Sequence, residues 1–203
     1  MKTKKILAQV FSFLFNPLLV MTLGVLLFLN SGFYFAMMSY EAKKYIVLII
    51  FLSTCILPAL SLGLLTFSPR FNAKMTKSTD RVVPLLLTAI YYYLGYYYLG
   101  KVPFFPIYRI LMLAAVLVII TLMLISMKWK VSNHMAGIGG FIGAIIALSF
   151  RLGMNSSLLL SGLIVVAGVL GTSRLILKKH NALQIYVGFF VGFAINYLII
   201  IYL

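Results

Sequence analysis

The sequence predicts an all-α integral membrane protein, a polytopic bundle of six to seven transmembrane helices. Of its 203 residues, 64% are hydrophobic and 9% are charged, and the mean hydropathy is +1.13. A soluble domain carries about a quarter of its residues as charges. Apolar runs of about 20 residues, long enough to cross a hydrocarbon core of about 30 Å, recur along the chain. We therefore expect a single integral-membrane helical domain over residues 1–203.

Each of the first two predicted helices contains a proline. The first covers residues 7–29 and has a kink at Asn16-Pro17; its apolar run is too long for a signal peptide, so we expect it to be retained. The second covers residues 45–67, where Pro58 is expected to bend it. Neighbouring helices can satisfy the backbone groups that a proline frees.

The third predicted helix begins near Pro84 and carries six tyrosines between residues 91 and 98. Six tyrosines in eight residues face all sides of a helix, so they form no single stripe. An interfacial aromatic belt is the favoured interpretation, supported by Lys101 just beyond. In the alternative, some of the hydroxyls line a headgroup pocket.

Four further helices follow. We expect them over residues 110–127, from directly after His134, over residues 157–170, and from residue 183 onward. Glycines four residues apart allow close packing of membrane helices, and two such pairs occur: Gly139 with Gly143, and Gly188 with Gly192.

The charged residues limit the chemistry. Seventeen basic residues face two acidic ones, Glu41 and Asp80. Paired-carboxylate hydrolysis and carboxylate metal sites are therefore not expected, and Cys55, the only cysteine, provides no thiolate zinc site. We predict no metal and no cofactor. Nucleic-acid binding is not expected either, because the basic residues are scattered through short loops. Membrane lipids and a phosphorylated lipid fit the positive charge better.

Three polar breaks interrupt the apolar runs, at residues 68–81, 128–134 and 171–184. Counting membrane crossings places all three on the same side as the amino terminus, and that side carries 12 of the 17 basic residues. The positive-inside rule then predicts that the breaks face the cytoplasm, in a bacterial inner membrane.

The first two breaks contain candidate phosphate ligands. Lys74 and Arg81 are seven residues apart, nearly two helical turns, and so project from one face of a helix. Ser132 and His134 stand at the start of the fifth helix, where free backbone N–H groups favour an anion. Ser132 either caps that helix or donates to a phosphate oxygen.

The third break contains Arg174 and His180. They cannot share one face of a straight helix, but they converge if the sixth helix ends near Arg174 and the seventh begins near His180. Gln184 follows His180 by four residues, one turn below it, and can hold the imidazole by accepting from one ring nitrogen while the other faces a substrate.

Together the breaks resemble the motifs of the type 2 phosphatidic acid phosphatase and vanadium haloperoxidase superfamily, K-x6-R-P, P-S-G-H and S-R-x5-H-x3-D. In this chain they read Lys74-x6-Arg81, Val131-Ser132-Asn133-His134 and Ser173-Arg174-x5-His180-x3-Gln184, within residues 74–184. Both histidines of the chain fall on the histidine positions of the family. The departures are Val82 for a proline, Val131 and Asn133 for proline and glycine, and Gln184 for the orienting aspartate.

The resemblance implies a metal-independent membrane phosphatase acting on a lipid phosphate or diphosphate, such as undecaprenyl diphosphate, phosphatidic acid or phosphatidylglycerol phosphate. It makes His180 the nucleophile that forms a phosphohistidine, and His134 the acid that protonates the leaving group. The phosphate oxygens would be bound by Lys74, Arg81, Ser132 and Arg174. Gln184 would orient His180 without a negative charge, so slower turnover or none is expected.

Two other hypotheses remain open. A catalytically silent relative would bind or move a phosphorylated lipid, as the missing aspartate and the altered second motif favour. A membrane scaffold with basic loops would leave its five candidate residues far apart: Lys74, Arg81, His134, Arg174 and His180. Bacterial members of the family commonly face outward, against the charge count. The sequence makes no prediction of oligomeric state.

Overall fold

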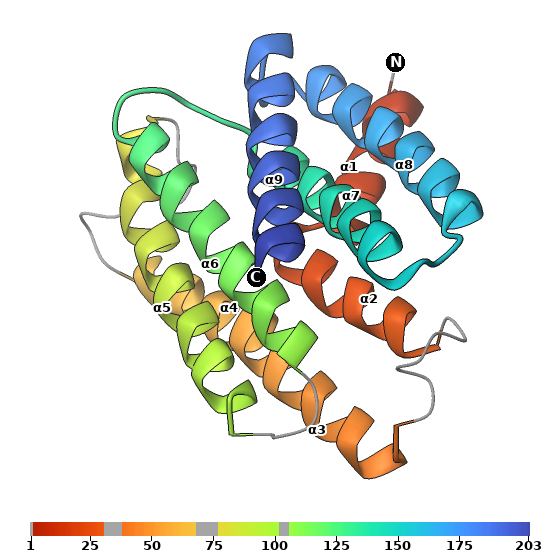
Figure 1. The fold of residues 1–203 in the computed structure, drawn as a ribbon. Coiled ribbons are helices and arrows are strands. Elements are labelled where there is room, and N and C mark those ends of the chain that lie inside the picture. The colour runs from red at the N-terminus through yellow and green to blue at the C-terminus, as the bar shows by residue number, and fades with distance from the viewer. Residues whose placement is uncertain (1, 31–37, 68–76, 102–105) are drawn as a thin grey trace.

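The computed structural model describes residues 2–30, 38–67, 77–101 and 106–203, and every regular element within them is a helix (Figure 1). Six helical stretches are long and apolar enough to span a membrane, and a bent pair at the amino terminus brings the total to as many as seven. The predicted all-α bundle of six to seven transmembrane helices is therefore confirmed for the described residues.

The amino-terminal stretch forms two helices, where one kinked helix was predicted. Helices α1 (Lys2–Leu14) and α2 (Pro17–Asn30) meet at an angle of 60°. Pro17 begins α2, where its missing N–H costs nothing, and Asn16 Oδ1 accepts from the Leu18 N–H at 3.1 Å as a cap. The bend carries α1 away from the line of α2 and packs it against α8.

The second predicted helix begins earlier than expected, at Tyr40. It comprises α3 (Tyr40–Phe51), a π-helical turn (Leu52–Ile56) and α4 (Leu57–Leu65). Ser39 caps its start, and Glu41 lies in the first turn, where a negative charge suits the helix dipole. Pro58 lies two residues beyond the end of the π turn, an irregular stretch of the kind at which helices bend.

A 3-10 turn at Thr79–Arg81 leads into α5 (Val82–Leu99), which packs along α6 (Pro106–Ser126). The tyrosines of α5 include both exposed and buried side chains. Tyr97 and Tyr98 are exposed, with the Lys101 ammonium 4.9 and 5.6 Å from their ring centroids, as suits an interfacial belt. Tyr92 is buried and lines an internal cavity.

The remaining helices are α7 (Asn133–Leu152), α8 (Ser157–Ile176) and α9 (Ala182–Tyr202). A Cβ on Gly139 or Gly143 would collide with the carbonyl of Phe189 or Phe193, and a Cβ on Gly192 would collide with the carbonyl of Ala136. The glycines thus let α7 and α9 approach closely, as predicted. The sixth predicted helix, 157–170, was too short, because α8 continues through Ser173 and Arg174 to Ile176.

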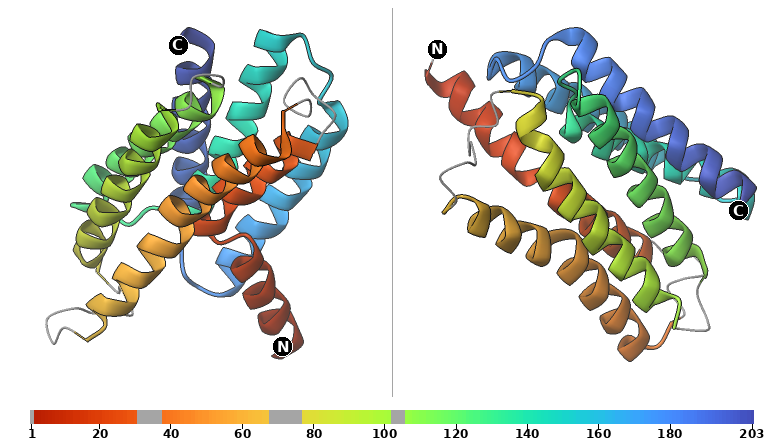
Figure 2. Two further views of the ribbon diagram at one scale, coloured as in Figure 1. Left: turned by 90° about the horizontal axis from the view of Figure 1, so that it is seen from below. Right: turned by 90° about the vertical axis from the view of Figure 1, so that its left-hand side faces the viewer.

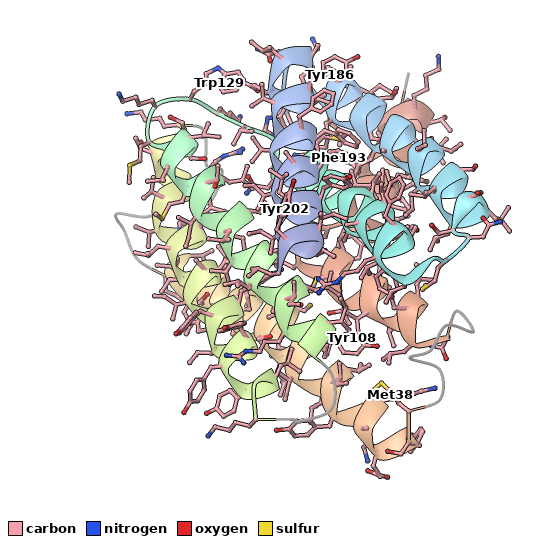
Figure 3. The ribbon with its side chains drawn as sticks, in the orientation of Figure 1. Met38, Tyr108, Trp129, Tyr186, Phe193 and Tyr202 are labelled. Atoms are coloured by element: carbon pink, nitrogen blue, oxygen red, sulfur yellow. The ribbon has the colours of Figure 1, made fainter. Side chains whose placement is uncertain are left out.

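The helices form two groups, joined by α2 and by a direct contact between α6 and α9, as the two views of Figure 2 show. One group holds α3 to α6, and the other holds α7 to α9 with α1. The start of α5, the end of α6, the start of α7, the end of α8 and the start of α9 all lie at one end of the bundle. Trp129 marks that end and Tyr108 the opposite one (Figure 3).

Candidate functional site

Residues from all three polar breaks line one cavity of about 400 Å³. Its polar part is formed by Arg81 at the start of α5, by Asn133 and His134 at the start of α7, by Arg174 near the end of α8, and by His180 between α8 and α9. The scaffold hypothesis expected five residues to lie far apart, and the four of them that the structure describes, Arg81, His134, Arg174 and His180, instead line one cavity. A cavity with a few convergent polar groups is the usual form of a small-molecule site.

The backbone between α8 and α9 fixes the place of His180. The N–H of Lys178 donates to the Leu175 carbonyl at 2.9 Å, and that of Lys179 to the Arg174 carbonyl at 3.1 Å. These bonds form a Schellman motif that ends α8, with Lys178 in the left-handed region at φ 52°. Asn181, two residues after Lys179, then caps α9. His180 is thus the single residue between two well-defined helix ends.

Gln184 holds the His180 ring in the predicted way. Its Oε1 lies 3.1 Å from Nδ1 of His180 and also accepts from the Asn181 N–H at 3.3 Å, while the Asn181 side chain caps the Gln184 N–H. Because Oε1 can only accept, Nδ1 carries the hydrogen in this contact. The lone pair of the neutral ring is then on Nε2, which has no hydrogen-bond partner within the described residues.

The surroundings keep His180 neutral. Burial, followed by the positive charges of Arg81 and Arg174, lowers its pKa to about 4, against the opposing effect of the Gln184 hydrogen bond. Burial and the nearby cations Arg81, Lys179 and Arg174 also lower the pKa of Lys130. The site is therefore strongly positive, and its imidazole lone pair is free at neutral pH.

The two arginines are held by neutral oxygens. Nη1 of Arg81 donates to the Val131 carbonyl at 2.9 Å, and Nη1 of Arg174 donates to Ser12 Oγ at 2.7 Å. The Nε atom of each guanidinium is buried and has no hydrogen-bond partner among the residues that the structure describes. A buried N–H without an acceptor is costly, so both arginines are poised to gain from an anion in the cavity.

Ser12, which the sequence did not single out, connects two of the predicted site residues. Its carbonyl accepts from Nε2 of His134 at 3.1 Å, and its hydroxyl accepts from Arg174. With Nε2 donating, Nδ1 of a neutral His134 is unprotonated, and a second proton is needed before the ring can act as an acid. Only the bend at Asn16-Pro17 brings Ser12 here. The sole local signal was a polar residue in an apolar run.

In the second motif, Ser132 and Asn133 have different roles in the structure. Ser132 is fully buried and caps α7 through the Met135 N–H at 3.4 Å, while its own N–H donates to the Gln184 carbonyl at 3.2 Å. Capping was one of its two predicted roles, and Ser132 does not line the cavity. Asn133 does, with a buried Oδ1 that has no hydrogen-bond partner in the described part of the chain. The sequence analysis had named Asn133 only as a departure from the family's motif.

Lys74, the remaining predicted phosphate ligand, lies outside the described residues. In the part of the chain that the structure does describe, no three histidine, cysteine, aspartate or glutamate side chains lie close enough to hold a metal ion. The polar end of the cavity accordingly offers guanidinium groups, imidazoles, an amide and helix-start N–H groups as its binding chemistry.

Comparison of the chain with protein-family models, with curated proteins and with solved structures gives no significant match.

Proposed function

We propose that this protein is a membrane phosphatase that hydrolyses a lipid phosphate or diphosphate through a phosphohistidine on His180. The observation that carries the proposal is the shared cavity, in which Arg81, Arg174, His134 and His180 meet although they come from three separate breaks in the sequence. The Nε atoms of both arginines have no partner among the described residues, and Nε2 of His180 is unprotonated, an arrangement that suits a phosphoryl group between them.

The reaction would proceed in two displacements. Nε2 of His180 attacks phosphorus, the bond from phosphorus to the leaving oxygen breaks, and that oxygen takes a proton from doubly protonated His134. Water then attacks the phosphohistidine, gives a proton back to His134 and releases inorganic phosphate and the free imidazole. Arg81 and Arg174 stabilise the charge on the transferring group throughout.

A second function, binding or moving a phosphorylated lipid without turnover, is favoured by Gln184. A neutral amide orients His180 but cannot stabilise an imidazolium as a carboxylate would. The hydrogen bond between His134 Nε2 and the Ser12 carbonyl also favours binding without turnover, since the neutral ring then has no proton on Nδ1 to donate to a leaving group.

The deciding experiment uses the full-length protein in phosphatidylcholine nanodiscs with labelled lipid phosphates and diphosphates. We expect phosphate release, and an acid-labile, base-stable phosphoryl group trapped on the wild-type protein and lost in His180→Ala. Lys128→Ala, an exposed cation at the same end of the bundle, is the matched control and should retain both signals. Release that persists in His180→Ala excludes the proposed nucleophile. Binding that depends on Arg174, without any release, identifies the silent binder.

We also propose that the site faces the cytoplasm, on the strength of the charge count. The lone cysteine makes the test simple, because a Cys55→Ala background leaves no other thiol. A cysteine placed at Lys128 should resist an impermeant maleimide on intact cells and react after lysis. Reaction on intact cells would place the site outside.

A further inference from the structure

Most of the cavity beneath the polar site is apolar. Below the arginines and histidines its wall is made by α2, α5, α6 and α7, with side chains such as Val25, Leu85, Val118 and Ala144. A phosphate group needs none of this surface. An apolar chamber joined to a cationic end is the shape required by a molecule with an anionic head and a hydrocarbon chain.

With the polar end included, the cavity spans similar lengths along its walls. Eleven positions separate Pro17 from Phe28 on α2, Leu111 from Leu122 on α6, Asn133 from Ala144 on α7, and Arg81, just before α5, from Tyr92 within it. At about 1.5 Å per residue, this is about 16 Å along the helices. One leaflet is half of a hydrocarbon core of about 30 Å, so the cavity, polar end and chamber together, is about one leaflet deep.

Two of the polar side chains within the chamber are already hydrogen-bonded to carbonyls of their own helices. Thr88 Oγ1 donates to the Pro84 carbonyl at 2.7 Å, and Asn196 Nδ2 donates to the Gly192 carbonyl at 3.0 Å. These groups therefore do not call for a polar ligand deep in the bundle. The available polar chemistry is concentrated at the end that holds Arg81, His134, Arg174 and His180.

Two aromatic rings lie at the far end. Phe28 of α2 and Phe141 of α7 pack edge to face, with centroids 5.9 Å apart. The Phe141 ring lies over Gly24, where an added Cβ would come within 2.7 Å of it. Such a pair, fitted against a neighbouring helix backbone, provides a firm floor to the chamber.

We propose that this chamber, between α2, α5, α6 and α7, is a binding site for one hydrocarbon chain of the phosphorylated lipid, and that Phe28 and Phe141 limit the length of chain it accepts. The identification of the lipid as a substrate rests on the function proposed above; the chain site itself does not require turnover. A lipid seated in this way has its phosphate at the arginines and one chain inside the protein instead of in the bilayer.

A photoreactive probe tests the site directly. A hexadecyl phosphate with a diazirine at the chain end is added to the full-length protein in phosphatidylcholine nanodiscs, and the labelled residues are found by mass spectrometry. We expect labels at the chamber floor, at Phe28, Leu111 or Phe141, and at least tenfold less labelling by the matching fatty alcohol. Labels confined to lipid-facing residues such as Val165 and Phe190, or no labelling, overturn the proposal.

Matched substitutions test chain length. Ala144→Leu fills the bottom of the chamber, and Ala194→Leu adds the same atoms to an exposed position on α9. We expect Ala144→Leu to weaken hexadecyl phosphate binding at least tenfold, with butyl phosphate unaffected and Ala194→Leu unchanged. Phe141→Ala should in turn extend the accepted chain. If the Ala144→Leu and Ala194→Leu proteins bind hexadecyl phosphate equally well, and butyl phosphate equally well, the chain site is refuted.

A second pair of variants tests the same site in case the Ala144→Leu protein does not fold. Gly137 lines the chamber, and a Cβ there would have its nearest neighbour 3.8 Å away, so a larger side chain can enter the open space. Gly168 is an exposed helix glycine whose Cβ would meet nothing within 4 Å. Gly137→Leu should lose hexadecyl phosphate binding at least tenfold, and Gly168→Leu should keep it; equal binding by the two overturns the chain site.

The two proposals fail separately. Labels at the chamber floor without any phosphate release keep the chain site and remove the phosphatase. Phosphate release with labels only on lipid-facing residues keeps the phosphatase and removes the chain site.

Discussion

Nδ1 of His180 lies 3.1 Å from Oε1 of Gln184, one helical turn further along the chain. The same amide oxygen completes the capping box of α9 by accepting from the Asn181 N–H. Gln184 thus joins the orientation of the imidazole to the start of the helix. What it lacks is a charge, and this determines the first prediction.

Gln184→Glu should raise the pKa of His180. Glutamate keeps the length of the side chain and the capping box, and its carboxylate favours the imidazolium. A rise of one pKa unit corresponds to about 1.4 kcal/mol, or tenfold, in favour of the charged ring. We expect phosphoenzyme formation to be faster by about tenfold, as measured by rapid quench. Gln184→Leu, which removes both hydrogen bonds, is the control and should be slower than wild type. An unchanged pKa in Gln184→Glu would show that the contact does not govern the ring.

His180 should stay neutral well below the ordinary histidine pKa of about 6.5, because its pKa is about 4 in the folded protein. The unfolded chain takes up a proton near pH 6.5 and the folded one only near pH 4. The contribution of His180 to stability is therefore fully present above pH 6.5 and is lost as the pH falls through 4. Inorganic phosphate should raise the pKa of the ring, because its negative charge offsets the arginines.

NMR of protein labelled with ¹⁵N-histidine measures this directly, since the chain has two histidines and His134→Gln identifies the remaining signal as His180. A ring that titrates near pH 6.5 without phosphate, or one that phosphate leaves unmoved, contradicts the proposed anion site.

Several features of the fold and site were predictable because they depend on neighbours in sequence. Pro17 marked the break in the first helix, and the glycine pairs marked the close contact of α7 with α9. The four-residue spacing of His180 and Gln184 fixed their contact, since residues one helical turn apart are adjacent. Local geometry of this kind can be read from sequence without knowing the rest of the fold.

Other features depend on distant contacts and were missed. Ser12 reaches His134 and Arg174 only because α1 turns by 60°, an angle that no local pattern specifies. The sixth helix was expected to stop at residue 170. Instead, α8 continues through the buried Gly171 to the Schellman motif, and a Cβ added at Gly171 would meet Ile185 and Met135 at ordinary contact distance. Tertiary packing there overrides the weak helix propensity of glycine.

Ser12→Ala should destabilise the protein in the absence of an anion. It removes the acceptor of the 2.7 Å bond from Arg174 and leaves a guanidinium N–H unsatisfied, at a cost of about 1–3 kcal/mol. The His134 contact is to the Ser12 carbonyl and survives the change. Phosphate should therefore stabilise the variant more than it stabilises wild type, because it supplies a new acceptor to Arg174.

Thermal unfolding in nanodiscs, with and without phosphate, provides the comparison. Ser161→Ala is the control, since the Ser161 hydroxyl bonds only within α8 at an exposed position. Equal stabilisation of the Ser12→Ala and Ser161→Ala variants by phosphate would separate Arg174 from the anion site.

Lys178→Gly should stabilise the turn that positions His180. Lys178 has φ 52°, which costs a residue with a side chain about 1 kcal/mol or more and costs glycine almost nothing. The exposed side chain makes the backbone effect the dominant one, so we expect a gain of about 1 kcal/mol in unfolding free energy. Lys178→Val, with a β-branched side chain in the same conformation, should lose stability. If both variants unfold like wild type, the left-handed residue is not what holds Arg174 and His180 in register.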